Sequence, residues 1–184
     1  MPASSRADND RVAYALAAQK SQRSRQNRSS GGAPRVRHCH TLTLPVARCR
    51  IDGVAAAIEV VGSRLAGGLV GKGRLLTTMD FGANIALAVG DMVTDWKGFD
   101  LAAHEVKLSL NGDLREEGVG ARALGHPINV LQWLANKQSQ TGRGLVKGEI
   151  VSTGTCTGVL GVAPGDHVIA DFGELGCVEI NFTE

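Results

Sequence analysis

The sequence is poor in aromatic residues, in proline and in long apolar runs. Aromatic residues make up 4% of the 184 residues, and there are 5 prolines. No stretch is apolar over the length that spans a bilayer, and no hydrophobic signal region opens the chain, so we expect no membrane partner. The 4 cysteines follow no CxxC or paired spacing, which predicts reduced thiols in a cytoplasmic protein.

Glycine, by contrast, is abundant. The chain holds 24 glycines, and 43% of its residues are hydrophobic. That apolar content is enough for the core of one domain, and frequent glycine suits short strands joined by tight turns better than a helical bundle. We therefore predict one β-rich domain.

Charge is distributed unevenly along the chain. Residues 1–50 hold 10 Lys and Arg against 2 acidic residues, whereas residues 51–184 hold 10 against 16. The basic part has one aromatic residue, Tyr14, and no base-stacking or zinc motif, so we predict no nucleic-acid partner. A short helix is expected over Arg11 to Gln19, within a basic and largely disordered segment 1–41 that precedes a domain over 42–184.

Several elements can be predicted from their local patterns. The stretch DGVAAAIEVVGSRLAG predicts an Ala-rich helix passing into a strand at Ile58 to Val61, and MDFGANIALAVGD is uncharged enough to be buried. His104 to Asn111 alternates as a half-buried strand that ends in an Asn-Gly hairpin turn. A helix is expected from about Pro127 to Thr141, lying on the sheet. Three short strands follow, over 149–152, 167–172 and 177–182.

Two short motifs suggest a metal site and a kinase, but the residues around them do not support either function. His38, Cys39, His40 and Cys49 do not have zinc-site spacing. Asp171 lies in ADFG, which is found in kinases, but no Gly-rich loop or HRD segment accompanies it. We assign neither motif a function.

Three motifs in order carry a family resemblance. LGHPINVLQWLANK, GEIVSTGTCTG and PGDHVIADFGELGCVEINF resemble the C-terminal half of the 2-keto-4-pentenoate hydratase family, within the fumarylacetoacetase superfamily. Upstream, AAAIEVVGSRLAGG and MDFGANIALAVG resemble two further segments of that family. The resemblance runs from about Leu44 to Glu184.

The resemblance implies a fold, a reaction and a cofactor. The fold would be α+β and β-rich, a curved mixed-sheet roll with a few helices, incomplete at the N-terminus. The reaction would be a hydro-lyase step in aromatic-compound catabolism, in which water adds to 2-hydroxypenta-2,4-dienoate to give 4-hydroxy-2-oxopentanoate. A divalent cation, Mg²⁺ or Mn²⁺, would activate the 2-oxo acid end of that small substrate as a Lewis acid. The implied partners are further copies of the chain and a pathway decarboxylase or aldolase.

The metal ligands implied by the resemblance are three carboxylates. Glu59 matches one of them. Aligning Leu44-Pro45 with the Leu-Pro that follows the family's Glu-x-Glu pair leaves Ala33 and Arg35 at the positions of the other two. A cation held by one carboxylate with an arginine nearby should bind much more weakly.

The remaining site residues are placed by the resemblance and by local chemistry. Asp80 is the candidate catalytic carboxylate, with a cap as the alternative. Thr153, Gly154 and Thr155 are the candidate substrate contacts, because hydroxyls and backbone N–H groups suit a carboxylate. Of two other conspicuous side chains, His126 is expected to satisfy backbone groups at a helix start and Trp133 to lie in the core.

Three functional hypotheses follow from this pattern. The first is the metal-dependent hydratase. The second is a catalytically impaired remnant that keeps the fold, and it is motivated by the missing Glu-x-Glu pair. The third is a related 2-oxo-acid decarboxylase, which would also use a divalent cation at the 2-oxo acid but would form a different product.

Overall fold

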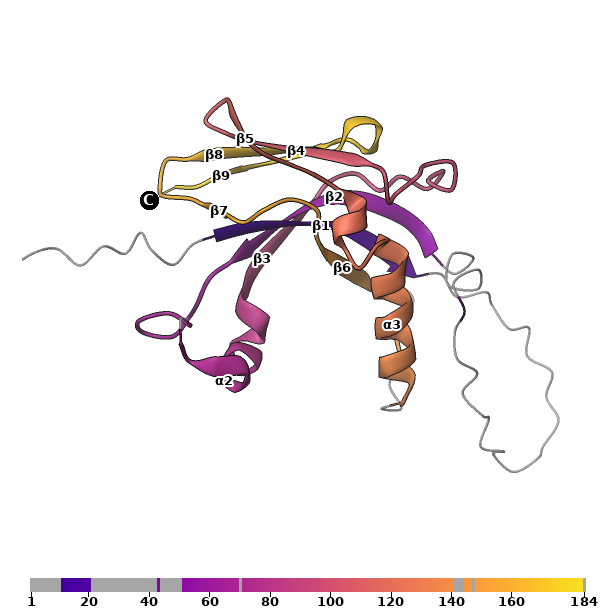
Figure 1. Ribbon diagram of the computed structural model, residues 1–184, viewed down its shortest axis with the longest axis horizontal. Helices are drawn as coiled ribbons and strands as arrows, with labels where there is room; N and C mark the ends of the chain where they lie inside the picture. Colours follow the sequence, from indigo (N-terminus) through magenta and orange to yellow (C-terminus); the bar gives the residue numbers. More distant parts are fainter. Residues whose placement is uncertain are drawn as a thin grey trace, which may run out of the picture.

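Two antiparallel β-sheets form the body of the protein and pack face to face, as the computed structural model shows (Figure 1). The structure describes residues 11–20, 43, 51–69, 71–140, 144–146 and 148–183. Among these residues every strand pair is antiparallel. The α+β, strand-rich class expected from the sequence is confirmed.

The first sheet has five strands. They are listed here in chain order: β1 (Arg11–Lys20), β2 (Ile51–Val61), β3 (Asn84–Val89), β6 (Ile150–Thr155) and β7 (Leu160–Gly161). Their order in the sheet is β3-β2-β1-β6, and β7 also pairs with β1. Strand β1 therefore joins the N-terminal and C-terminal parts of this sheet.

The second sheet has four strands. They are β4 (Glu105–Leu110), β5 (Asp113–Val119), β8 (His167–Asp171) and β9 (Cys177–Asn181), in the order β5-β4-β8-β9. The β4–β5 connection is tight, with Asn111 and Gly112 both at positive φ, 53° and 88°. Two successive positive φ values are what an Asn-Gly hairpin turn requires.

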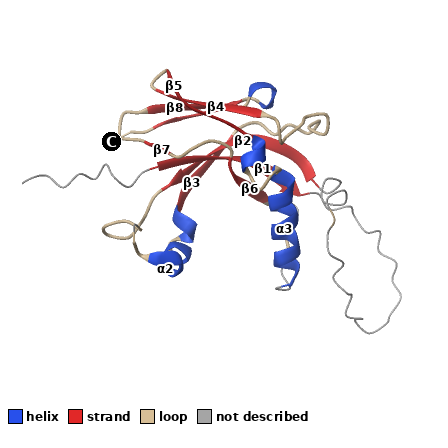
Figure 2. Cartoon of the chain, in the orientation of Figure 1, coloured by secondary structure: helices blue, strands red, loops and turns tan. Residues whose placement is uncertain are grey.

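Helices lie on the side of the first sheet that faces away from the second (Figure 2). They are α2 (Gly73–Met79) and α3 (Pro127–Gln140). Short 3₁₀ turns lie between α2 and β3, before α3, and between β8 and β9: they are η2 (Phe81–Ala83), η3 (Gly120–Arg122) and η4 (Gly173–Leu175). Pro127 opens α3, where its missing N–H costs nothing. His126 Nδ1 accepts the Ile128 N–H at 3.0 Å, which confirms the expected backbone-capping role of this histidine.

The hydrophobic core fills the space between the two sheets. Buried side chains from β2, β4 and β8 meet there, together with the fully buried Trp96 and Phe172. The strand contributions are Val54, Ala56, Ile58, Val106, Leu108, Val168 and Ala170. Ile128 and Leu131 of α3 belong to the same cluster, so the predicted α3 and β4 are both confirmed with the expected faces buried.

Two helix predictions are wrong. The chain forms strand β1 where a helix was expected over Arg11 to Gln19, and β2 is extended throughout where an Ala-rich helix was expected at its start. The physical reason is pairing with distant strands: β1 matches β2 from Arg11 opposite Val61 onward, and this pairing outweighs the local helix propensity of alanine. The domain boundary expected at residues 41/42 stays a prediction, because it lies outside the described residues.

Two burial predictions are also wrong. Within MDFGANIALAVGD, Asp80 is buried, but Met79 is 68% exposed and Phe81 76% exposed. Trp133, expected in the core, is 61% exposed on α3. Composition alone suggested burial at each of these positions, yet no described element of this chain covers them.

A buried glycine fixes the approach of η3 to the rest of the fold. A Cβ atom at Gly120 would lie 1.8 Å from the Leu101 carbonyl oxygen, whereas one at Gly98 would meet nothing within 4 Å. We expect Gly120→Ala to lower the free energy of unfolding by about 3 kcal/mol, because backbone atoms cannot give way as side chains do. Gly98→Ala is the matched control. Equal denaturation midpoints for the two variants would contradict the close approach.

Candidate functional site

Glu59 lies on the face of the first sheet that carries the helices. Its neighbours Ile58 and Val60 are buried, and Ile58 belongs to the core between the sheets. Because successive side chains of a strand point to opposite faces, Glu59 points away from that core. This is the side on which α2 and α3 lie (Figure 1).

An amide group holds the Glu59 carboxylate. Asn84 Nδ2 donates a hydrogen bond to Glu59 Oε1 at 2.8 Å, and both side chains are half-buried. Asn84 begins β3 and is registered opposite Val61, two residues beyond Glu59 on the same face. The pairing of β2 with β3 therefore sets this contact.

Asp80 is buried and fully engaged by hydrogen bonds. Ser63 Oγ and the Arg64 backbone N–H both donate to Oδ2, at 2.9 and 3.0 Å, and Arg64 Nη1 donates to Oδ1 at 3.1 Å. The Asp80 side chain is 4% exposed and the Arg64 side chain 46%. Asp80 therefore connects the end of α2 to the segment that follows β2.

The surroundings of Asp80 keep it ionised. Burial acts to raise its pKa, but the hydrogen bonds from Ser63 and Arg64, together with the Arg64 charge, outweigh burial and hold the pKa below the ordinary aspartate value of 3.8. A carboxylate so held is a weak proton acceptor near neutral pH. Its geometry suits positioning Arg64 better than abstracting a proton.

Arg64 joins the two carboxylate sites into one network. Its Nη2 donates to the Asn84 carbonyl at 2.9 Å, and its guanidinium lies over the Phe81 ring, 5.2 Å from the centroid. The chain of contacts runs from Glu59 through Asn84 and Arg64 to Asp80. Ser63, Arg64 and Asn84 lie within the two upstream family-like segments, but the sequence predicted no role for them.

The Thr153–Thr155 segment lies at the C-terminal end of β6. Thr155 is registered opposite Ala15 of β1, which is itself opposite Ala57, so Thr155 shares the sheet face of Glu59. The two are separated by about 10 Å across two strand spacings and about 7 Å along them. The candidate carboxylate and the candidate substrate strand therefore border the same face.

The three residues of this segment differ in access. Thr153 is buried, 1% exposed, so its hydroxyl is turned inward. Gly154 is exposed with φ at +100°, and the β1–β6 register shifts beside it. Thr155 Oγ1 donates to the Thr157 carbonyl at 2.9 Å, which leaves its oxygen lone pairs as acceptors. Gly154 and Thr155 are therefore accessible at the surface, and Thr153 is not.

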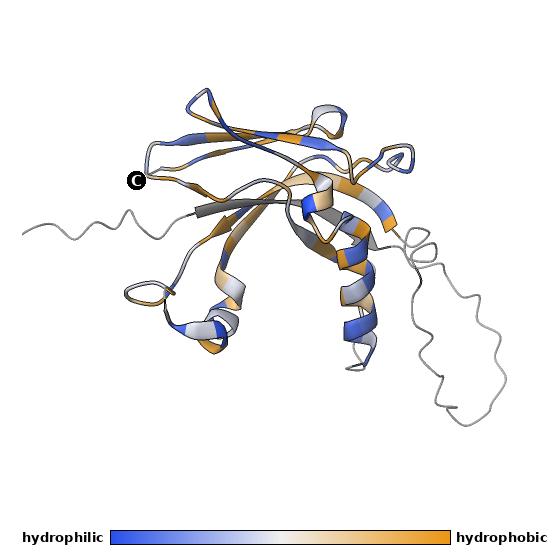
Figure 3. Ribbon diagram, viewed as in Figure 1, coloured by the Kyte–Doolittle hydropathy of each residue, from blue (hydrophilic) through white to orange (hydrophobic). Residues whose placement is uncertain are grey.

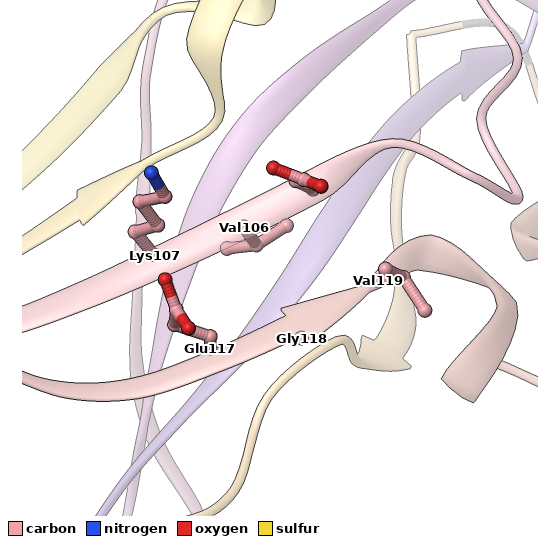
Figure 4. Close-up of a pocket in the computed structure, with 6 residues that line it drawn as sticks. Val106, Lys107, Glu117, Gly118 and Val119 are labelled. Atoms are coloured by element: carbon pink, nitrogen blue, oxygen red, sulfur yellow. The ribbon is translucent and has the colours of Figure 1, made fainter.

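Two pockets of the described surface lie apart from Glu59 and Asp80. One, of about 240 Å³, lies on the β4–β5 hairpin, where Lys107 and Glu117 stand opposite each other on neighbouring strands (Figure 4). Another, of about 370 Å³, lies between α3 and the start of β6 and is bordered by Ser152. Neither contains the Glu59–Asp80 network.

The described residues contain no cluster of three His, Cys, Asp or Glu side chains that could hold a metal ion. Ala33 and Arg35 lie outside the described residues. The sequence has no acidic residue between Asp10 and Asp52, so that stretch supplies no carboxylate to Glu59. Cys156 and Cys177 are free thiols, and no described helix has the length and hydropathy to cross a membrane.

Comparison with known proteins places these residues in a family. The model of the fumarylacetoacetate (FAA) hydrolase C-terminal family matches residues 36–183. The chain is 31% identical over 132 residues to a 2-keto-4-pentenoate hydratase of Paraburkholderia xenovorans, covering 72% of this chain and 48% of that protein. It is 30% identical over 133 residues to a 4-oxalocrotonate decarboxylase of Pseudomonas putida, covering 72% and 49%.

A solved structure with the same fold is the 4-oxalocrotonate decarboxylase from Pseudomonas putida G7, complexed with magnesium and adipate. It superposes with a TM-score of 0.77 at 26% identity, covering 95% of this chain and 60% of that one. The chain spans about half the length of the curated relatives it matches. The family match and these relatives confirm the resemblance drawn from the three motifs: the chain belongs to the fumarylacetoacetate (FAA) hydrolase C-terminal family.

Proposed function

We propose that the chain is a hydratase that adds water to 2-hydroxypenta-2,4-dienoate or a close relative, giving 4-hydroxy-2-oxopentanoate in aromatic-compound catabolism. The observation that carries the proposal is the polar network from Glu59 to Asp80 on a face that also holds Gly154 and Thr155. The hydratase names of several relatives support the substrate class. A cytoplasmic location and a homo-oligomer form part of the same proposal.

The proposed chemistry has two steps. The 2-hydroxydienoate first ketonises, losing the proton of its 2-hydroxyl and gaining one at C5, and water then adds to the remaining carbon–carbon double bond, which is conjugated with the new 2-oxo group. The hydroxyl bonds to the carbon remote from the carbonyl, and a proton adds to its neighbour. Glu59 is the group we assign to accept the proton of the attacking water, because it is the half-buried carboxylate on this face and Asn84 fixes its orientation. Gly154 and Thr155 bind the substrate carboxylate.

Asp80 acts in this proposal through Arg64. Its oxygens accept three hydrogen bonds from Ser63 and Arg64, so it has little capacity left to exchange protons with a substrate. Arg64 in turn reaches the Asn84 carbonyl, and Asn84 holds Glu59. Asp80 is therefore a positioning residue for Glu59.

A divalent cation does not fit the residues that the structure describes. The relatives' decarboxylase structures contain magnesium or calcium, and the family resemblance implies Mg²⁺ or Mn²⁺ here. Glu59 is engaged by Asn84, Asp80 is engaged by Arg64, and the described residues offer no three-ligand cluster. We therefore derive no step through a cation.

Two other functions have specific support. A non-catalytic member of the family is favoured by the absence of acidic residues between Asp10 and Asp52, where the Glu-x-Glu pair would stand. A 2-oxo-acid decarboxylase is favoured by the decarboxylase relatives, which match as strongly as the hydratases. The three functions differ in whether the dienoate is consumed and in whether carbon dioxide is released.

The first prediction concerns turnover. We expect the purified chain to lower the ultraviolet absorbance of 2-hydroxypenta-2,4-dienoate, and Glu59→Gln to reduce kcat/KM about 100-fold because it removes the proton acceptor. Glu105→Gln, at an exposed glutamate of the second sheet, is the control with wild-type kinetics. If the wild type leaves the absorbance unchanged, the chain is a non-catalytic member of the family. If it releases carbon dioxide from 4-oxalocrotonate, the chain is a decarboxylase.

The second prediction concerns the metal. Calorimetric titration of the wild-type chain with Mn²⁺ should give no stoichiometric binding tighter than a Kd of about 10⁻⁴ M, because few carboxylates surround Glu59. The double variant Ala33→Glu with Arg35→Glu places carboxylates at both positions of the family's Glu-x-Glu pair. It should tighten Mn²⁺ binding at least about tenfold. Tight one-to-one binding by the wild type would mean that ligands come from other residues.

The third prediction concerns pH. Because the pKa of folded Asp80 lies below the unfolded value, its contribution to stability is complete above pH 3.8 and is lost as the pH falls through the folded pKa. Asp80→Asn should therefore lower the melting temperature at neutral pH, with a difference from wild type that shrinks below pH 3.8.

The control for this experiment is an exposed ion pair. Asp113 contacts Arg115 at 3.1 Å, with side chains 74% and 48% exposed. Such pairs contribute little to stability, so Asp113→Asn should melt with the wild type. A pH-independent Asp80→Asn difference would show that the carboxylate charge is not what stabilises this contact.

A further inference from the structure

Strand β5 of the second sheet touches the first sheet at the loop that follows Thr155. A Cβ atom on Gly118 of β5 would lie 1.9 Å from the carbonyl oxygen of Cys156, far inside van der Waals contact. The backbone of β5 and the backbone of this loop therefore meet with no side chain between them. Glycine is the residue that permits two backbones to approach so closely.

Glu116 makes a second contact with the same loop. A Cβ atom on Gly158 would lie 2.7 Å from Glu116 Oε2, so the carboxylate lies against the Gly158 backbone. In the pairing of β4 with β5, Glu116 is opposite Leu108 and Gly118 is opposite Val106, and both β4 side chains are buried in the core. Residues opposite each other share a sheet face, so Glu116 and Gly118 both face the first sheet.

A carboxylate on an inward face calls for an explanation. The sequence of β5 is DLREEGV, and Figure 3 shows hydrophilic colouring along much of this strand. β5 ends its sheet, and Glu116 is half-buried there, beside the core and not within it. The contact that the structure gives this carboxylate is with Gly158, at the end of the loop.

The end of β6 needs support from outside its own sheet. Among the described strands β6 pairs with β1, and this pairing shifts register between Ala15 and Ala17. Gly154 lies beside the shift, exposed and with a φ of +100°. Such an irregularity disrupts the ladder locally, so pairing alone fixes this end of the strand less firmly than the rest.

The loop is itself tied to the side chain of Thr155. Thr155 Oγ1 donates a hydrogen bond to the Thr157 carbonyl at 2.9 Å, and a hydroxyl has one proton to donate. Cys156 and Thr157 are buried, 1% and 2% exposed. A displacement of the loop would therefore move Thr155 and the backbone next to it.

We propose that β5 positions the substrate-binding end of β6, with Glu116 as a positioning residue and Gly118 as the point of backbone contact. This inference rests on the proposed function, in which Gly154 and Thr155 bind the substrate carboxylate. β5 holds the loop from the side of the second sheet, so that the donors of Gly154 and Thr155 keep one direction. Donors held in place before the substrate arrives need no reorganisation when it binds.

Coupled substitutions test the positioning role. Gly158→Ala places a methyl group against the Glu116 carboxylate, and we expect KM for 2-hydroxypenta-2,4-dienoate to rise about tenfold with kcat changed less than about twofold. Glu116→Ala should raise KM about threefold, and adding Gly158→Ala to it should cause no further rise, because the obstructing carboxylate is gone. Gly161→Ala, in β7, is the matched control with wild-type KM, since its Cβ atom would meet nothing within 4 Å.

Alkylation of Cys156 reads the same contact without turnover. Its thiol is buried, whereas that of Cys177 is exposed and serves as an internal reference. Iodoacetamide labelling followed by peptide mass mapping should label Cys177 at one rate in all variants. Cys156 should react at least about tenfold faster in Gly158→Ala than in the wild type, and Gly161→Ala should leave its rate unchanged.

The two readouts distinguish a failure of this inference from a failure of the proposed function. Turnover by the wild type, together with unchanged KM and unchanged Cys156 labelling in Gly158→Ala, would overturn the inference alone. A lower kcat at unchanged KM would also overturn it, because loss of folded protein reduces the active fraction without weakening substrate binding. A wild type without turnover overturns the proposed function and the substrate role of this contact with it, whatever the labelling shows.

Discussion

Strand β2 is the element on which the rest of the structure depends. It pairs with β1 on one side and β3 on the other, and it packs against the second sheet through Val54, Ala56 and Ile58. Ala55 and Ala57, on the opposite face, are also fully buried. A strand covered on both faces needs small or apolar side chains nearly everywhere. Glu59 is an acidic exception near the C-terminal end of β2, and its side chain accepts a hydrogen bond from Asn84.

The hydrogen bonds of Asp80 attach α2, which does not pair with β2 as β3 does. Helix α2 has no buried residue of its own, so the hydrogen bonds of Asp80 at its C-terminal end attach it to the segment that follows β2. Burying that carboxylate is tolerable because three donors from Ser63 and Arg64 replace the lost water. The same contacts orient Arg64 toward Asn84, so the attachment of α2 and the geometry around Glu59 are physically coupled.

Elements with strong local signals could be predicted from the sequence. The Asn111-Gly112 turn and the alternation of β4 are properties of a few neighbouring residues, as are the proline start and apolar spacing of α3. β1 and the start of β2 could not be predicted in this way. Their alanines favour a helix locally, and the partners that make them strands lie 31 to 50 residues away in the chain.

The site shows the same division between local and distant information. Glu59 and Asp80 were found through family motifs, and the structure links them through Asn84 and Arg64. The hydrogen bonds of this network join residues 16 to 25 positions apart, a separation at which sequence periodicity says nothing. The exposure of Phe81 and Trp133 was missed for the opposite reason, because composition reports what a residue prefers and not whether its own chain covers it.

The distance between Glu59 and Thr155 is controlled by β1, although neither residue belongs to it. Ala13 is registered opposite Glu59, and Ala15 opposite Thr155. A slip of one residue in either pairing would turn one of the two side chains to the core face, because side chains alternate along a strand. The register shift between Ala15 and Ala17 lies beside Gly154, whose φ of +100° accommodates the irregularity. The backbone of β1 thus sets the spacing between Glu59 and Thr155 across the face.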